Sequence, residues 1–136
     1  MPDFKLWFTD GTTLTNNDIK NKVVVFKLWF TSCLPCLIDI GELNGLVDEY
    51  KNIEDILFIA PALDNKDIIK NFIRENKFDF KIAYSSIETI QKLNTIQSYP
   101  SYFIVNRNGE FSYIDGGTKK KEFANLKKAL ERTLKE

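Results

Sequence analysis

Histidine is missing from this chain of 136 residues, and neither sign of charge is in excess. Without histidine, Ser–His and Cys–His catalysis and histidine-ligated metal sites are excluded. Lysine plus arginine and aspartate plus glutamate both number 19, so the net charge is zero. A balanced charge argues against a protein that binds nucleic acid, or a polybasic membrane-surface protein, through bulk charge. Nucleophilic or proton-transfer chemistry must therefore come from Cys, Asp, Glu, Lys or Tyr.

Long apolar segments are also missing. No run of about 18 apolar residues occurs, so we expect no membrane span in this chain. The first residues, MPDFKLWF, lack the basic region and the following apolar stretch of a signal peptide. The chain is thus either a cytosolic protein or a mature domain whose leader is absent. Its length predicts a single domain over residues 1–136, and we expect a monomer.

Hydrophobic periodicity predicts an α/β fold. A nearly continuous apolar run at 23–30, VVVFKLWF, is typical of a strand buried on both faces of a parallel sheet. The other expected strands are 4–8, 12–14, 56–60, 80–83, 102–105 and 110–114, which include two hairpins with turns at Asp10-Gly11 and Asn108-Gly109. The expected helices run from TSCLPC to Tyr50, over 65–76, over 87–94, and from the solvated run Lys119–Lys121 to the end. A central mixed β-sheet with helices on both faces follows.

Cysteine is scarce, and its two copies carry the most specific signal. Cys33 and Cys36 form a C-x-x-C motif between the strand at 23–30 and the following helix. A helix N-terminus presents unpaired N–H groups and about half a positive charge, both of which stabilise a thiolate. We therefore expect the pKa of Cys33 to lie below the free value of roughly 8.5, which makes Cys33 a nucleophile and a good leaving group. Cys36 should be more buried and act as the resolving thiol, while Pro35 restricts the intervening loop.

Two other interpretations of this cysteine pair carry less weight. A structural disulfide gains most from closing a long loop, and this pair closes a short one. A zinc site usually needs four ligands, and no further cysteine or histidine is present. The motif thus favours redox chemistry, with no metal and no organic cofactor.

The segment VVVFKLWFTSCLPC, followed much later by YPSYFIVNRNGE, resembles the thioredoxin superfamily. It is more closely similar to the TlpA/ResA-like thiol–disulfide oxidoreductases. The resemblance covers nearly the whole chain and includes the N-terminal hairpin and Trp29, four residues before Cys33. The long segment 61–99 matches the extra helix and strand of the TlpA/ResA-like group. The resemblance therefore implies a thioredoxin fold with an N-terminal β-hairpin and a central helix/strand insertion.

The same resemblance implies further site residues. Pro100 would be cis and lie beside Cys33, and the backbone of Tyr99 would pair with an extended substrate segment. Trp29 would belong to the substrate-binding surface. Asp39 would fill the family's acidic position and either accept the Cys36 proton or raise the thiol pKa. The alternative for Asp39 is an ordinary solvated helix residue.

The chain departs from the family pattern at three positions. Ser32 replaces the aromatic residue that is common before the first cysteine. Gly41 replaces a proline, which predicts a helix without the usual kink. Lys27 stands where thioredoxin has a buried acid and where the TlpA/ResA-like group is usually polar but uncharged. Its ammonium either approaches Cys36 and favours the thiolate, or reaches water from the strand end, and the second interpretation is slightly favoured.

The sequence predicts a thiol–disulfide oxidoreductase in which Cys33 attacks a protein disulfide and Cys36 resolves the mixed disulfide. The resemblance implies reduction in an extracytoplasmic location, with electrons supplied by another dithiol protein. A general cytosolic thioredoxin and a non-catalytic thioredoxin-fold binding module are the alternatives. A peroxiredoxin-like peroxidase ranks low, because the proline and threonine spacing of that family is absent: Thr31 lies only two residues before Cys33.

Overall fold

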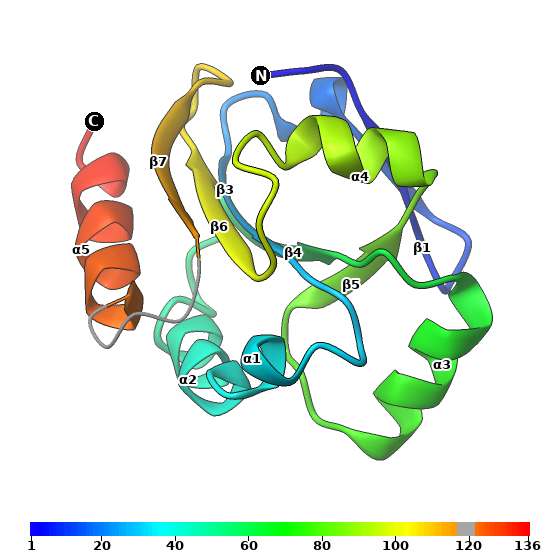
Figure 1. Cartoon of the computed structure of the whole chain (residues 1–136). Helices are drawn as coiled ribbons and strands as arrows, with labels where there is room; N and C mark the ends of the chain where they lie inside the picture. Colours follow the sequence, from blue (N-terminus) through cyan, green and yellow to red (C-terminus); the bar gives the residue numbers. More distant parts are fainter. Residues whose placement is uncertain (117–121) are drawn as a thin grey trace.

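The computed structural model describes residues 1–116 and 122–136, so the predicted run Lys119–Lys121 lies outside the described residues. The strands form one seven-stranded sheet in the order β2-β1-β5-β4-β3-β6-β7 (Figure 1). Strands β3, β4 and β5 are parallel, and every other neighbouring pair is antiparallel. The strands are β1 (Lys5–Phe8), β2 (Thr13–Thr15), β3 (Val23–Leu28), β4 (Ile56–Pro61), β5 (Lys81–Tyr84), β6 (Ser101–Val105) and β7 (Phe111–Gly116). The mixed sheet that the sequence predicts is confirmed.

Helices cover both faces of this sheet (Figure 1). One face packs against α1, α2, α3 and α5, and the other packs against α4 and the N-terminal segment that includes η1. The helices are η1 (Asn16–Ile19), α1 (Leu34–Leu37), α2 (Ile40–Glu49), α3 (Lys66–Glu75), α4 (Ile87–Leu93) and α5 (Glu122–Leu134). Among the described residues, no helix is both long enough and apolar enough to cross a membrane.

Strand β3 lies inside the sheet, between β4 and β6, and is buried along its whole length. Its side chains alternate between the two cores, because successive residues of a strand point to opposite faces. Val23 and Val25 join the core under α2 and α5, whereas Val24 and Phe26 join the core under α4. This double burial is the physical reason for the continuous apolar run in the sequence. The alternation also places Lys27 on the face that α1 and α2 cover.

The helix after the cysteines differs from the prediction. It is interrupted at Ile38 and Asp39, so α1 and α2 are separate although Gly41 stands where the family often has proline. The ammonium of Lys27 donates a hydrogen bond to the carbonyl oxygen of Cys36, in the last turn of α1. A continuous helix would use that carbonyl to accept the N–H of residue 40. A buried lysine therefore accounts for an interruption that needs no proline.

Candidate active site

Cys33 and Cys36 form a disulfide where the chain leaves β3 and enters α1. Their Cα atoms are 5.2 Å apart, and the N–H of Cys36 donates to the carbonyl of Cys33 at 3.0 Å. Cys33 is the N-cap of α1, and Pro35 lies in its first turn, where a missing N–H costs nothing. Cys33 is 6% exposed and Cys36 is 0% exposed, which agrees with the predicted order of burial. The outer sulfur is thus the one that a partner can reach.

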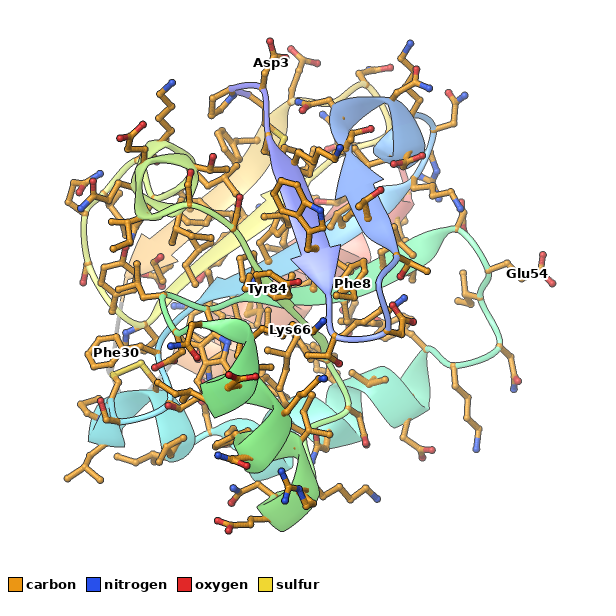
Figure 2. All side chains as sticks on the ribbon, turned by 90° about the vertical axis from the view of Figure 1, so that its right-hand side faces the viewer. Asp3, Phe8, Phe30, Glu54, Lys66 and Tyr84 are labelled. Atoms are coloured by element: carbon orange, nitrogen blue, oxygen red, sulfur yellow. A yellow bond between two sulfur atoms is a disulfide. The ribbon has the colours of Figure 1, made fainter. Side chains whose placement is uncertain are left out.

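Two hydrogen bonds hold the loop between β3 and α1, one within the loop and one to the segment after β4. The N–H of Cys33 donates to the carbonyl of Phe30 at 3.1 Å, and the disulfide lies close to Phe30 in Figure 2. The N–H of Thr31 donates to Asp64 Oδ2 at 2.6 Å. Asp64 was not predicted as a site residue. It follows β4, a parallel neighbour of β3, and the carboxyl ends of parallel strands meet at one edge of a sheet, so its position after that strand was the available signal.

The Tyr99–Pro100 peptide bond is cis, the isomer that the family resemblance implies. Tyr99 lies against Phe30 with the two rings edge to face and their centroids 5.9 Å apart. The backbone carbonyl of Phe30 accepts the N–H of Cys33, so Phe30 belongs to the cysteine loop. The contact between its ring and Tyr99 therefore joins this loop to the segment before β6. The hydroxyl of Tyr99 is buried and has no hydrogen-bond partner among the described residues. Tyr99 thus contacts the cysteine loop through Phe30, and the position of Pro100 beside Cys33 stays a prediction.

Trp29 is fully buried, and the prediction that it contacts substrate is wrong. Its indole N–H donates to the carbonyl of Ala60 at 3.2 Å. The rings of Phe72 and Phe78 pack edge to face against it, with centroids 5.0 Å and 5.4 Å away. The reason is geometric, because Trp29 continues the alternation of β3 into the core under α3. Trp29 therefore packs in the core beneath α3 and supports the cysteine loop from the protein interior.

The expectation that Lys27 reaches water is also wrong, because its side chain is 0% exposed. Three aromatic rings surround the ammonium, with centroids 5.3 Å away for Phe78, 5.7 Å for Trp29 and 5.8 Å for Tyr102. It donates to the carbonyl of Cys36 and forms an ion pair with Asp39 Oδ1 at 2.9 Å. Lys27 is the next-to-last residue of β3, but its side chain points into the core that α1 and α2 cover, where the aromatic rings and Asp39 enclose it. The other predicted position, in which the ammonium approaches Cys36, is the one that the structure shows.

Asp39 is held from two sides. Lys27 binds its Oδ1 atom, and the hydroxyl of Tyr102 donates to its Oδ2 atom. The Asp39 side chain is only 20% exposed, so it is not an ordinary solvated helix residue. Tyr102 was missed, because only the antiparallel register, in which Lys27 pairs with Tyr102, reveals that the two share a face.

The surface beside the disulfide is apolar. Leu34 is 75% exposed and Ile38 is 80% exposed, although both are large hydrophobic residues. They flank Cys36 in the sequence, and Ser32, where the family commonly has an aromatic residue, is exposed as well. Within residues 1–116 and 122–136, no group of three or more His, Cys, Asp or Glu side chains could hold a metal ion. The side chains described at this site that can exchange electrons or protons are the two cysteines and Asp39.

Known proteins share both the sequence pattern and this fold. The chain matches the Redoxin family over residues 1–130. It is 28% identical over 110 residues to thiol-disulfide oxidoreductase ResA of Bacillus thuringiensis subsp. konkukian, a match that covers 80% of this chain and 63% of that protein. The chain thus spans less than two thirds of the length of that relative.

Two solved structures show the same fold at low identity. One is assigned as thiol:disulfide interchange protein DsbE of Chlorobium tepidum, with a TM-score of 0.86, 22% identity, and coverage of 98% of this chain and 94% of that chain. The other is StoA of Bacillus subtilis, with a TM-score of 0.75, 20% identity, and coverage of 95% and 96%. These matches confirm the predicted thioredoxin fold. The chain belongs to the Redoxin family and is a TlpA/ResA-like member of the thioredoxin superfamily.

Proposed function

We propose that this chain is a thiol–disulfide oxidoreductase that reduces disulfides of protein substrates. The observation that carries the proposal is the Cys33–Cys36 disulfide at the N-terminal end of α1, in which Cys33 is the less buried cysteine and Cys36 is fully buried. Such a pair has the two properties that exchange requires, namely a reachable sulfur and a second thiol within bonding distance. The name of the ResA relative agrees with this chemistry.

The reaction proceeds in two steps. The thiolate of Cys33 attacks one sulfur of a substrate disulfide, and the other substrate sulfur leaves as a thiolate. Cys36 then attacks Cys33, which closes the intramolecular disulfide and releases the second substrate sulfur. Asp39 takes the proton of Cys36 in this second step. The substrate gains two electrons, and a separate dithiol protein returns two electrons to the cysteines.

The substrate docks as an extended segment. The backbone of Tyr99, next to the cis Pro100 bond, pairs with that segment in the manner of an added strand. The exposed side chains of Leu34 and Ile38 cover the apolar residues of the partner, which removes those side chains from water. The site is thus suited to unfolded or extended protein segments.

The direction and the location follow from the TlpA/ResA-like resemblance. We propose net reduction, outside the cytoplasm. A redox titration of the Cys33–Cys36 pair against glutathione tests the direction. Dithiol proteins of this fold cover roughly −270 to −120 mV, and we expect a value near the reducing end. A value near the oxidising end would overturn the assignment as a reductase.

Trapping of mixed disulfides tests the exchange itself. A Cys36→Ser variant cannot complete the second step, so it should accumulate covalent adducts with a disulfide-containing protein substrate. Mass spectrometry should place each adduct on Cys33. The matched control is Cys33→Ser, which retains the buried thiol and should form no adduct. If the Cys36→Ser variant forms none either, the chain is a binding module and not a catalyst.

A further inference from the structure

The site contains a charged cluster that the cysteine chemistry alone does not require. Its members are Lys27 on β3, Tyr102 on β6 and Asp39 between α1 and α2. Lys27 and Tyr102 are cross-strand partners, so both side chains rise from the same face of the sheet. Each binds one oxygen of Asp39, and Lys27 also donates to the carbonyl of Cys36. A single ammonium thus joins the resolving cysteine to the carboxylate.

The surroundings of this cluster make its charges effective. Lys27 is 0% exposed and the Asp39 side chain is 20% exposed, so water screens their interaction weakly. Among the described residues of β7, Asp115 is the cross-strand partner of Tyr102 and so lies on the same face of the sheet, where it accepts a hydrogen bond from Tyr113 at 2.8 Å. Lys27 is the cation that the structure places against Asp39 and the Cys36 carbonyl. Its positive charge therefore favours a negative charge on Asp39 or on Cys36.

We propose that Lys27 and Tyr102 are positioning residues that keep Asp39 an oriented carboxylate and thereby set the pH at which Cys36 gives up its proton. This inference rests on the proposed function. In the resolving step, the Cys36 proton moves to the carboxylate of Asp39. The Cys36 sulfur then bonds to Cys33, the bond from Cys33 to the substrate sulfur breaks, and that sulfur leaves with the electron pair. The two cysteines are oxidised and the substrate is reduced.

The direction of the effect follows from charge. The ammonium of Lys27 contacts both Asp39 and the carbonyl of Cys36, so its charge acts on this pair of groups. The step requires that this pair has already lost one proton. The ammonium of Lys27 and the hydroxyl of Tyr102 both stabilise the negative charge that this loss leaves behind. Removal of either group should therefore move the onset of the resolving step to higher pH.

A single-turnover assay with dithiobis-nitrobenzoate as the disulfide isolates the step. Reduced protein is mixed with one equivalent of reagent, and the absorbance of released thionitrobenzoate is followed. Attack by Cys33 releases the first thionitrobenzoate, and attack by Cys36 on the mixed disulfide releases the second. The rate of the second phase is measured between about pH 5 and pH 9, and its acid limb reports the ionisation that enables resolution.

We expect Lys27→Met to raise the midpoint of the acid limb by about one pH unit or more, which makes resolution about tenfold slower well below that midpoint. Tyr102→Phe removes only the hydroxyl and should raise the midpoint by a smaller amount. Lys81→Met and Tyr84→Phe are matched controls, because both residues lie on β5, separated from β6 by two strands, and should leave the midpoint unchanged. A purely structural role for the cluster would lower thermal stability without moving the midpoint.

An unchanged or lowered midpoint in folded variants would overturn the inference. If Lys27→Met does not fold, Tyr102→Phe decides the matter, because it preserves the shape of the ring. The proposed function fails in a different way, namely when wild-type protein releases no second thionitrobenzoate at any pH. The two failures are therefore distinguishable in one data set.

Discussion

The buried ion pair predicts an asymmetry between two substitutions, Asp39→Asn and Lys27→Met. The two partners differ in burial, because the Lys27 side chain is 0% exposed whereas the Asp39 side chain is 20% exposed. Asp39→Asn removes the negative charge that pairs with a fully buried ammonium at 2.9 Å. Lys27→Met removes the charge from the core and leaves a carboxylate that reaches water and still accepts the hydroxyl of Tyr102. The first change should therefore cost more free energy of unfolding than the second.

The expected magnitudes follow from the burial of each partner. Breaking a buried pair by removal of one partner typically costs about 3–5 kcal/mol, and we expect Asp39→Asn to lie near the lower value because the new amide oxygen still accepts a hydrogen bond from Lys27. Lys27→Met should cost about 1–2 kcal/mol. For a chain of this size, a loss of about 3 kcal/mol corresponds to a fall in Tm of about 10 °C. The double variant should be close to Lys27→Met, because the buried ammonium is absent from both.

Chemical denaturation of the oxidised protein measures these free energies of unfolding. Asp48→Asn is the matched control, because Asp48 pairs with Lys51 at 3.2 Å on the surface, where the two side chains are 73% and 63% exposed. That change should cost less than about 0.5 kcal/mol. The deficit of Asp39→Asn should shrink as pH rises, because a neutral amine is easier to bury than an ammonium. A cost of Lys27→Met equal to or above that of Asp39→Asn would refute the reasoning.

Three further predictions concern the support around the site and the N-terminal hairpin. Asp64→Ala removes the acceptor for the N–H of Thr31 and should lower the free energy of unfolding by about 1 kcal/mol in chemical denaturation, whereas no loss would contradict the anchoring role. Trp29→Phe should lower it by about 1–3 kcal/mol and leave the first thionitrobenzoate release unchanged, whereas a slower first release would restore Trp29 as a substrate contact. Hydrogen bonds from the side chain and the backbone of Thr12 lower the pKa of Asp10, so its contribution to hairpin stability is present above the ordinary carboxyl pKa and is lost as pH falls through the lowered value. Thr12→Val should raise the pKa of Asp10 in an NMR titration, and an unmoved titration curve would contradict the assignment of its cause.

Much of the fold could be predicted because local patterns determine it. The continuous apolar run of β3 indicated burial on both faces, and the turn at Asn108-Gly109, where Gly109 has φ +79°, indicated the hairpin of β6 and β7. The C-x-x-C motif was placed correctly between a strand and a helix for the same reason. The interruption between α1 and α2 was not predicted, because its cause is a side chain that arrives from β3. Local periodicity contains no information about such a contact.

The cluster around Asp39 shows where sequence reasoning fails. Alternation along β3 placed Lys27 on the face of Val25 and Trp29, but it could not show which helix would cover that face. Asp39 and Tyr102 come from segments far apart in the chain, and only the pairing of β3 with β6 brings them together. A lysine near a strand end and a buried lysine in an ion pair have the same local sequence. Tertiary packing separates the two cases.

The reactivity of Cys33 tests the central claim most directly. The reduced protein is treated with an alkylating agent over a range of pH, and peptide mass spectrometry reports the modification of each cysteine. We predict that Cys33 is alkylated well before Cys36, with a midpoint below the ordinary thiol value of roughly 8.5. A midpoint at or above that value, or an earlier modification of Cys36, would contradict the account.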